Sequence, residues 1–228
     1  MGERRIFATG DALADTAAAR IAAAAASAIA ARGRFSLALS GGRTPQPLYL
    51  RLVTAEIDWT RVRIFFADER AVPPDDPESN FRLARETLLD AAHVPPRNVH
   101  RMKGEYADLA AAALEYEAHL TEACDVIVLG IGEDGHVASL FPHGAALGEI
   151  TRRVAPVLDA PKPPPRRLTL TPRALAEAGD VLVLATGSGK AAAVAAALSS
   201  AGSTEETPAR LVRDRVWLLD RAAAALLQ

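Results

Sequence analysis

The sequence predicts an α/β fold: a single domain over residues 1–228 with a mostly parallel, Rossmann-like sheet flanked by helices. Short apolar runs alternate with longer segments of helical composition, which favours a parallel sheet. Residues 126–129 form an unbroken apolar run, as expected of a strand whose two faces are covered by helices. Half of the 228 residues are hydrophobic, so the chain can bury one sizeable core, and we find no internal repeat.

The first elements follow from composition and from residues that begin or end helices. Residues 11–32 are alanine-rich, lack glycine and proline, and precede Gly33, so they predict a long helix. Residues 35–40 predict a short buried strand that stops at two glycines. Thr44 is then expected to cap a helix that begins at Pro45 and continues through Val53, because proline suits the first helical position.

The rest of the chain repeats this alternation. Proline-containing segments at 71–78 and 156–165 predict surface connections, and the alanine-rich segment after residue 190 predicts a helix. The alternating pattern at 167–171 predicts a strand with one exposed face. The other predicted strands are at 62–67, near 98–102, and at 126–129, 181–185, 211–213 and 216–219, with helices near 80–90 and at 107–121.

Four polar clusters directly follow apolar strands. In open parallel sheets, ligands bind outside the carboxyl ends of the strands. We therefore expect the clusters to meet at one edge of the sheet, and this convergence is stronger evidence for a ligand site than any single motif. The clusters are SGGRT at 40–44, DER at 68–70, GIGEDGH at 130–136 and GSGK at 187–190.

Two of these clusters have the features of anion sites. Gly41 and Gly42 lack Cβ groups at a strand-to-helix turn, so backbone N–H groups can approach an anion; the alternative is a plain tight turn with a helix cap. Lys190 follows a second such turn, where a single phosphate or carboxylate contact is reasonable. This second turn is not a Walker A loop, because Leu184 stands where that motif has glycine and Ala191 where it has Ser or Thr.

His136 is the candidate general base. The preceding segment GIGEDG matches the dinucleotide pattern G-x-G-x-x-G, but the proline and glycine that follow interrupt the helix this pattern requires, which disfavours nucleotide binding. A lone histidine is more often structural, yet at the ligand edge and near carboxylates it suits acid–base chemistry, because histidine titrates near neutral pH. Cys124 precedes its strand at the other end and is a poor nucleophile candidate, and no residue spacing indicates a metal site.

Charge and cysteine content narrow the partners and the compartment. The 26 basic and 28 acidic residues are spread along the chain, which gives no electrostatic reason to expect nucleic acid or an anionic membrane. A single cysteine cannot form an internal disulfide, which indicates a reducing compartment. The N-terminal segment does not resemble a signal peptide, and the run 21–31 is too short and weakly hydrophobic to span a bilayer. We expect a cytoplasmic protein.

Taken in order, the motifs resemble those of the 6-phosphogluconolactonases, within a fold family shared with the glucosamine-6-phosphate deaminases. The resemblance covers nearly the whole chain and is most specific around His136. It implies a sugar-phosphate isomerase/deaminase-like fold and hydrolysis of 6-phospho-D-glucono-1,5-lactone to 6-phosphogluconate, a step of the oxidative pentose phosphate pathway, with no metal or cofactor. The motifs are LALSGG at 37–42 with Thr44-Pro45, FADER at 66–70, Ser79-Asn80, GIGEDGHVASLFP at 130–142, RLTLT at 167–171 and GSGK at 187–190.

The resemblance also implies a role for each site residue. His136 would take a proton from the water that attacks the lactone carbonyl, Asp134 would orient that water or a sugar hydroxyl, and Arg70 would stabilise charge on the carbonyl oxygen. Two cations and aligned amides suit a phosphate dianion. The implied substrate-binding residues are Ser40, Gly41, Gly42, Thr44, Asp68, Arg167 and Lys190. The expected partner is a small sugar-phosphate lactone, and the expected state is a monomer or weak homo-oligomer.

Two alternative functions remain. A glucosamine-6-phosphate deaminase or isomerase would share the glycine loops and the pair Asp68-Glu69, so the fold cannot separate the two reactions. Those enzymes carry Tyr after this pair, where this chain has Arg70, and Glu five residues after the histidine, where it has Phe141. A non-catalytic sugar-phosphate sensor domain would usually be attached to a DNA-binding segment, and the sequence has no spare basic module for one.

Overall fold

The structure, a computed structural model, describes residues 2–227. Its strands are β1 (Arg4–Phe7), β2 (Phe35–Leu39), β3 (Val62–Phe66), β4 (Asp68–Arg70), β5 (Val126–Gly130), β6 (Val154–Val157), β7 (Arg167–Leu170), β8 (Asp180–Ala185) and β9 (Val216–Asp220). Its α-helices are α1 (Gly10–Arg32), α2 (Gln46–Leu52), α3 (Asn80–Ala84), α4 (Leu109–His119), α5 (Pro172–Glu177) and α6 (Ala191–Leu198).

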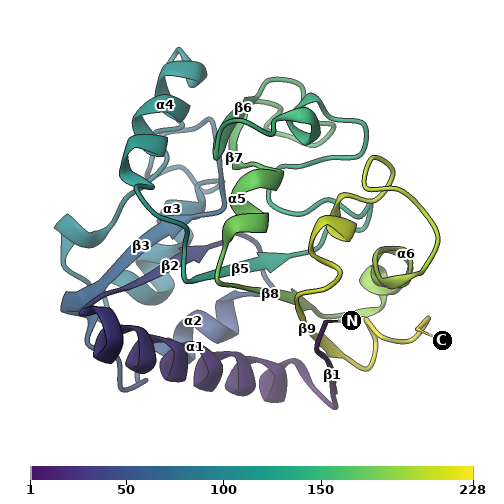
Figure 1. Cartoon of the computed structure of the whole chain (residues 1–228), viewed down its shortest axis with the longest axis horizontal. Coiled ribbons are helices and arrows are strands. Elements are labelled where there is room, and N and C mark those ends of the chain that lie inside the picture. Colours follow the sequence, from purple (N-terminus) through teal and green to yellow (C-terminus); the bar gives the residue numbers. More distant parts are fainter. Residues whose placement is uncertain (1, 228) are drawn as a thin grey trace.

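The strands form two sheets of different kind. Six parallel strands make the larger sheet in the order β1-β9-β8-β5-β2-β3, and three antiparallel strands make the smaller sheet in the order β4-β7-β6. In Figure 1, α1 and α2 lie below the larger sheet, whereas α5 and the smaller sheet lie above it. The predicted α/β class with a mostly parallel sheet flanked by helices is confirmed.

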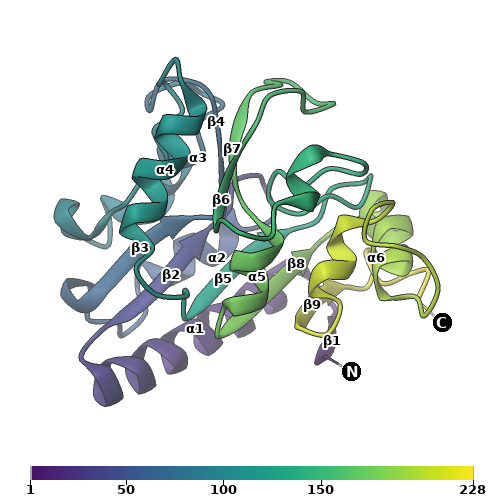
Figure 2. The same cartoon turned by 45° about the horizontal axis from the view of Figure 1, so that its top comes forward.

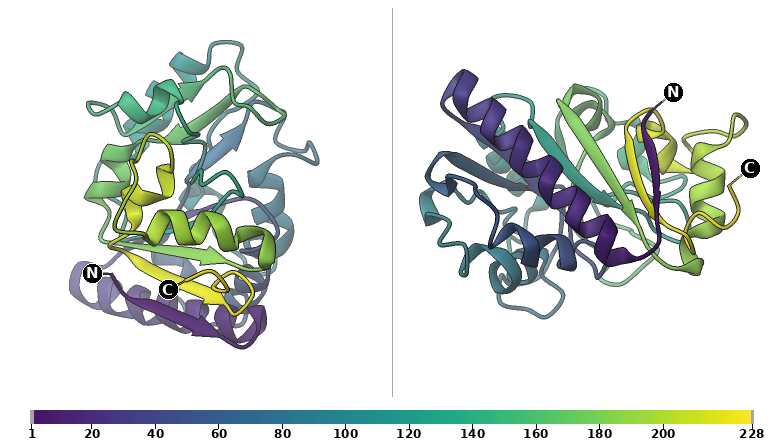
Figure 3. Two further views of the ribbon diagram at one scale, coloured as in Figure 1. Left: turned by 90° about the vertical axis from the view of Figure 1, so that its right-hand side faces the viewer. Right: turned by 90° about the horizontal axis from the view of Figure 1, so that it is seen from below.

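Helix α1 covers one face of the larger sheet, as Figure 3 shows from below. Its buried face consists of leucine, isoleucine and small alanine side chains, which allow the helix to lie close to the strands. The whole helix is longer than the run 21–31 considered from sequence, and by length and composition alone it could cross a membrane. A core helix passes the same test, and the buried residues of α1 belong to the main hydrophobic core: Leu13, Ala14, Ala17, Ala18, Ile21, Ala25 and Ala28.

One residue joins the two sheets where the site lies. Only Ala67 separates β3 from β4 along the chain, and this residue is fully buried. Its N–H donates to the carbonyl of Leu39 in the larger sheet at 2.7 Å. Its carbonyl accepts the N–H of Leu170 in the smaller sheet, also at 2.7 Å. Figure 2 shows β4 and β7 rising away from the larger sheet beyond this point.

Two predicted strands are wrong. The segment 98–102 forms no strand: Pro96–Asn98 is a 3₁₀ turn, and Val99 makes only an isolated bridge to Ile64. Residues 211 and 212 belong to a 3₁₀ helix, Pro208–Val212, because the preceding proline favours the start of a helical turn over a strand. The predicted helix near 80–90 divides into α3 and a π-helical turn, Arg85–Leu89.

The smaller sheet was the least predictable part. Pro156 lies in β6 rather than in a surface connection, and it is tolerated there because β6 is an edge strand. The predicted exposed face of β7 is wrong, since this strand is central in its sheet and buried throughout. Strand β1 and helix α5 have no counterpart among the predictions.

The predicted cap of α2 is also wrong: the helix begins at Gln46, and the Thr44 hydroxyl instead lies 3.3 Å from that of Thr186.

Candidate active site

The four polar clusters meet at one cavity, as the sequence predicts. Its volume is about 420 Å³, and it lies at the carboxyl ends of β2, β3, β5 and β8, which belong to the larger sheet. Every residue predicted to belong to the site lines this cavity except Asp134, which stands behind His136. The lining residues are Ser40, Gly41, Gly42, Arg43, Thr44, Pro45, Asp68, Arg70, Asn80, Gly130, Ile131, Gly132, Glu133, His136, Ala138, Lys162, Arg167 and Lys190.

The most specific feature of the cavity is a histidine–carboxylate pair. Nδ1 of His136 lies 2.5 Å from Oδ1 of Asp134, and the two side chains are 20% and 30% exposed. Burial would raise the pKa of Asp134, but hydrogen bonds with His136 and with Lys162 outweigh it and hold the pKa well below its usual range. The carboxylate therefore stays ionised and can hold a proton on Nδ1, which leaves Nε2 of the imidazole as the basic nitrogen.

Sequence reasoning missed Lys162, whose Nζ lies 3.1 Å from Oδ2 of Asp134. This lysine lies in the proline-rich segment 156–165, which carries no recognisable motif. The only signal in the sequence is a single cation between prolines, and such a residue is ordinarily a solvated surface charge. In the structure, Lys162 lines the cavity, and its ammonium group contacts the Asp134 carboxylate oxygen that does not face His136.

Arg167 is buried, and most of its donors are already used. Its Nε donates to the carbonyl of Pro164 at 2.9 Å, and its Nη2 donates to those of Pro163 and Lys162 at 3.1 and 3.2 Å. Nη1 lies 4.0 Å from Oδ2 of Asp68. Burial lowers the pKa of Arg167 and the Asp68 charge opposes that shift. The predicted phosphate contact is therefore left to Nη1 alone.

Asp68 is tied into the wall of the cavity. The Ser139 hydroxyl donates to its Oδ2 at 2.6 Å, and the Asn80 amide donates to its Oδ1 at 3.0 Å and to its carbonyl oxygen at 2.9 Å. All three residues are buried. This network fixes Asn80 beside the first glycine turn: a Cβ on Gly41 would lie 1.8 Å from the Asn80 Oδ1, so only glycine fits there.

Behind the cavity, Glu69 accepts four hydrogen bonds although it is only 2% exposed. The donors are the backbone N–H groups of Arg70, Asn80 and Phe81 at 2.7 to 2.8 Å and the Ser79 hydroxyl at 3.1 Å. Burial raises the pKa of Glu69 to about 7, against the effect of these hydrogen bonds. Through these hydrogen bonds the Glu69 carboxyl group links the residues that precede and follow the loop 71–78.

Arg70 extends from the end of β4 into the cavity. Its Nη1 donates to the carbonyl of Glu78 at 2.6 Å and lies 3.8 Å from that residue's carboxylate. Its Nε is buried and has no hydrogen-bond partner within residues 2–227. Because an unpaired buried donor is costly, this N–H is available to an acceptor on a ligand.

The anion-binding side of the cavity combines a glycine turn with a lysine. Gly42 and Thr44 line it from the first turn, and Lys190 lines it from the turn after β8. Burial lowers the pKa of Lys190, and no ion pair of this ammonium group occurs among the residues that the structure describes. The Ser40 hydroxyl lines the cavity but donates to the carbonyl of Val128 at 2.7 Å, so it can offer a ligand only its lone pairs.

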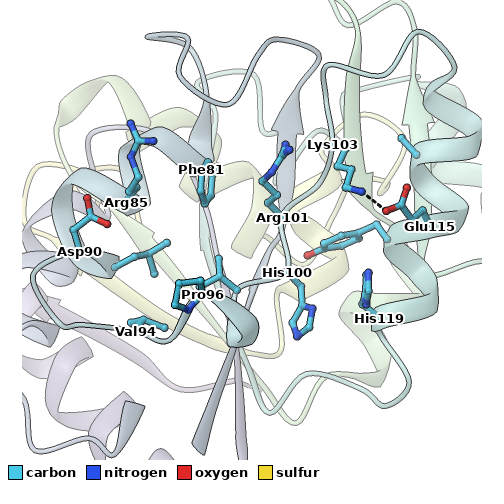
Figure 4. Close-up of a pocket in the computed structure, with 14 residues that line it drawn as sticks. Phe81, Arg85, Asp90, Val94, Pro96, His100, Arg101, Lys103, Glu115 and His119 are labelled. Atoms are coloured by element: carbon cyan, nitrogen blue, oxygen red, sulfur yellow. Dashed lines mark hydrogen bonds and ion pairs between the residues drawn. The ribbon is translucent and has the colours of Figure 1, made fainter. Parts of the chain in front are cut away.

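A second cavity, of about 500 Å³, lies beside β3 between α3 and α4 (Figure 4). Two of its cations are already paired, since Lys103 contacts Glu115 and Arg101 contacts Glu105, whereas the Arg85 guanidinium lies 5.9 Å from the centroid of the Phe81 ring. Burial and nearby positive charge lower the pKa of His100 to about 4, so this imidazole is neutral at physiological pH. Within the described residues the cavity contains no histidine–carboxylate ion pair, and no cluster of three or more potential metal-ligating side chains occurs anywhere in residues 2–227. The first cavity is therefore the candidate active site.

The fold and the site together define a class: α/β proteins that carry an acid–base histidine beside anion-binding glycine turns at the carboxyl edge of a parallel sheet. The family is narrower. Residues 8–219 match the family model described as glucosamine-6-phosphate isomerases/6-phosphogluconolactonase, and the chain belongs to this family.

Individual relatives agree with this assignment. A 6-phosphogluconolactonase of Mycobacterium bovis is 43% identical, with 97% of each chain covered. The solved structure of a 6-phosphogluconolactonase from Trypanosoma cruzi is 28% identical and superposes with a TM-score of 0.88, covering 100% of this chain and 97% of that one. A monomeric glucosamine-6-phosphate deaminase, 24% identical over 98% of this chain and 99% of that one, superposes with a TM-score of 0.86, which shows a shared fold alone.

Proposed function

We propose that this protein hydrolyses 6-phospho-D-glucono-1,5-lactone to 6-phosphogluconate, with His136 as the general base. Curated relatives such as the one from Mycobacterium bovis carry the name of this activity at 43% identity. The mechanism rests on the 2.5 Å contact between His136 and Asp134, because His136 lines a cavity that also contains the glycine turns and Lys190, which forms no ion pair within residues 2–227.

The reaction follows from the placement of these groups. Asp134 holds the proton on Nδ1, so Nε2 of His136 takes a proton from water as the water oxygen attacks the lactone carbonyl carbon. The Nε–H of Arg70, which has no partner among residues 2–227, stabilises the negative charge that forms on the carbonyl oxygen. The bond from the carbonyl carbon to the ring oxygen then breaks, and the imidazolium returns its proton to that oxygen. The new carboxylic acid ionises, so each turnover releases one proton.

Substrate binding is assigned to the opposite side of the cavity. The backbone of Gly41 and Gly42, the Thr44 hydroxyl and the Lys190 ammonium group would hold the phosphate, with Arg167 limited to its Nη1. Because Lys190 lacks an ion pair in the described residues, a phosphate would supply the missing counter-charge. A lactone is an activated ester, so this set of side chains needs no covalent intermediate.

The remaining expectations are part of the same proposal. We treat residues 1–228 as one domain, which is supported by a main hydrophobic core that contains residues of both sheets. We also propose a cytoplasmic monomer or weak homo-oligomer that does not bind nucleic acid or membranes. In support, the large exposed apolar side chains are scattered over different elements: Ile6, Leu50, Tyr106, Leu114, Ile150, Leu158 and Leu226.

Proton release during lactone hydrolysis tests the proposed reaction. The purified protein is mixed with freshly made 6-phosphogluconolactone, and the rate is corrected for spontaneous hydrolysis. We expect rapid release of one proton per lactone and no ammonia from glucosamine 6-phosphate. Ammonia from the second substrate would favour the deaminase alternative, and binding of either compound without turnover would favour the sensor alternative.

A further inference from the structure

The His136–Asp134 pair belongs to a closed ring of contacts among five residues. Lys162 Nζ lies 3.1 Å from Asp134 Oδ2, and Asp134 Oδ1 lies 2.5 Å from His136 Nδ1. The His136 ring lies 4.5 Å from that of Phe141, centroid to centroid, and the Arg167 guanidinium lies 5.4 Å from the same Phe141 ring. Arg167 Nη2 closes the ring by donating to the carbonyl oxygen of Lys162 at 3.2 Å.

Within this ring, Asp134 has two partners on opposite oxygens. Oδ1 faces the imidazole of His136, and Oδ2 faces the ammonium group of Lys162. The carboxylate is therefore held in one orientation by two charge-assisted contacts, which are the stronger kind of hydrogen bond. Without Lys162, Oδ2 would have no partner among the described residues, and the carboxylate could rotate away from Nδ1.

The backbone that carries Lys162 is unusually constrained for a loop. Proline precedes it at 161 and follows it at 163, 164 and 165, which restricts the backbone torsions of the segment. The buried guanidinium of Arg167 binds the carbonyl oxygens of Lys162, Pro163 and Pro164. A lysine whose backbone is fixed in this way loses less conformational entropy when its ammonium group stays beside Asp134.

From these contacts we propose that Lys162 is a positioning residue, which holds Asp134 ionised and correctly oriented and, through it, keeps His136 protonated on Nδ1 with Nε2 facing the water. Arg167 supports this role by fixing the segment that carries Lys162. The inference rests on the proposed lactone hydrolysis, because its effect is read from the catalytic rate.

Several other charged groups line the same cavity, and they contribute equally to the pH profiles of wild type and variant. They come from the first glycine turn, β4, the loop after β5, β7 and the turn after β8: Arg43, Asp68, Arg70, Glu133, Arg167 and Lys190. None of them forms an ion pair with Asp134 or His136 in the described residues, so Lys162 is the lysine or arginine that contacts the carboxylate.

Four variants test the proposal: Lys162→Met, Lys162→Arg, Asp134→Asn and the double variant Lys162→Met/Asp134→Asn. In Lys162→Met we expect kcat to fall about tenfold, a change of about 1.4 kcal/mol in the barrier, while KM stays within about twofold of the wild-type value. Lys162→Arg keeps the charge and should restore most of kcat. A matched control is Lys103→Met, which removes a lysine paired with Glu115 in the other cavity and should leave both constants unchanged.

The pH profile and the double variant separate positioning from a general structural effect. Lys162→Met removes a positive charge beside the Asp134–His136 pair, and the loss of this nearby cation favours the protonated form of the imidazole. Since the base must be neutral, the acid limb of the rate profile should move to higher pH. In the Asp134→Asn background, Lys162→Met should cause no further loss of kcat, because the residue through which it acts is already disabled.

Three results would overturn the proposal. A higher KM with unchanged kcat in Lys162→Met would make Lys162 a substrate contact. A tenfold loss that persists in the Asp134→Asn background would show that Lys162 acts independently of Asp134. Wild-type kinetics of Lys162→Met would show that Lys162 has no effect on the reaction. Failure of the proposed function is distinguishable, because the wild-type protein would then release no protons from the lactone before any variant is compared.

Discussion

A Cβ atom on Gly132 would lie 2.0 Å from Nδ1 of His136 and 2.4 Å from Oδ1 of Asp134. Both distances are far below van der Waals contact, so the histidine–carboxylate pair can occupy its position only because residue 132 has no side chain. We predict that Gly132→Ala displaces the pair and lowers kcat by about 100-fold, the scale expected when a reacting group moves by about 1 Å.

Kinetics together with thermal unfolding measure this effect. The matched control is Gly148→Ala, since a Cβ at Gly148 meets no atom within 4 Å and the residue lies outside the cavity. It should keep full activity. An active Gly132→Ala enzyme with unchanged kcat would show that the pair tolerates movement and would contradict the assigned geometry.

The general-base assignment predicts a loss of rate without a loss of binding. His136→Ala removes the group that takes the proton from water, and kcat should fall by about 10²- to 10⁴-fold. Calorimetric titration with 6-phosphogluconate should give nearly the wild-type Kd, because the phosphate contacts remain. His143→Ala serves as control, since His143 is 67% exposed and pairs with Glu205 outside the cavity. Normal turnover by His136→Ala would remove His136 from the mechanism.

Phosphate binding by Lys190 predicts the opposite pattern. Contact with a group remote from the reacting carbonyl is equally strong in the ground state and the transition state, so its loss acts on KM. Lys190→Ala should raise KM by about tenfold or more, given about 1.5 to 3 kcal/mol for a hydrogen bond to a charged group, with kcat nearly unchanged.

Glucono-1,5-lactone without the phosphate provides the control substrate for this variant. Wild type and Lys190→Ala should hydrolyse it equally slowly, because neither can use the missing phosphate. A fall in kcat at constant KM, or an equal loss on both lactones, would contradict phosphate binding by Lys190.

Glu69 predicts a pH dependence of stability. Burial raises its pKa in the folded protein from about 4.5 to about 7. Between these two values the folded chain keeps a proton that the unfolded chain releases, so the contribution of this group to the free energy of unfolding falls as pH rises from about 4.5 to 7. The slope is at most about 1.4 kcal/mol per pH unit for one proton.

Urea denaturation of wild type and Glu69→Gln across this pH range isolates the effect. The variant lacks the titrating group, so the difference in unfolding free energy between the two proteins should change through the window and level off on either side. Parallel curves would mean that Glu69 has the same pKa in the folded and unfolded chain.

The sequence predicts which residues come together at the candidate cavity, and the reason is physical. Gly41, Gly42 and Gly132 follow apolar strands directly, and parallel strands bring their carboxyl ends to one edge, so local patterns suffice to place them. His136 and Lys190 follow the same logic. The family resemblance adds the activity, which the pattern alone leaves open.

What local patterns do not predict depends on distant contacts. Lys162 lies beside Asp134 in a proline-rich segment whose carbonyl oxygens are bound by the Arg167 side chain. Glu69 acquires its role only when four donors from two segments meet at its carboxyl group. Strand β6 is not predicted because it contains Pro156, and proline is tolerated in a strand only at the edge of a sheet. Each of these features is a consequence of tertiary structure rather than of residue spacing.

The double role of Ala67 has a mechanical consequence for the cavity. Since one buried residue is bonded to both sheets, the smaller sheet cannot tilt at this junction without breaking a backbone hydrogen bond to the larger one. Asp68 and Arg70 belong to β4, which begins directly after Ala67, so the backbone bonds of Ala67 restrict where these two residues can lie. This wall of the cavity is therefore formed before a ligand binds. Little free energy is needed to order it on binding, and such preorganisation favours tight and selective recognition.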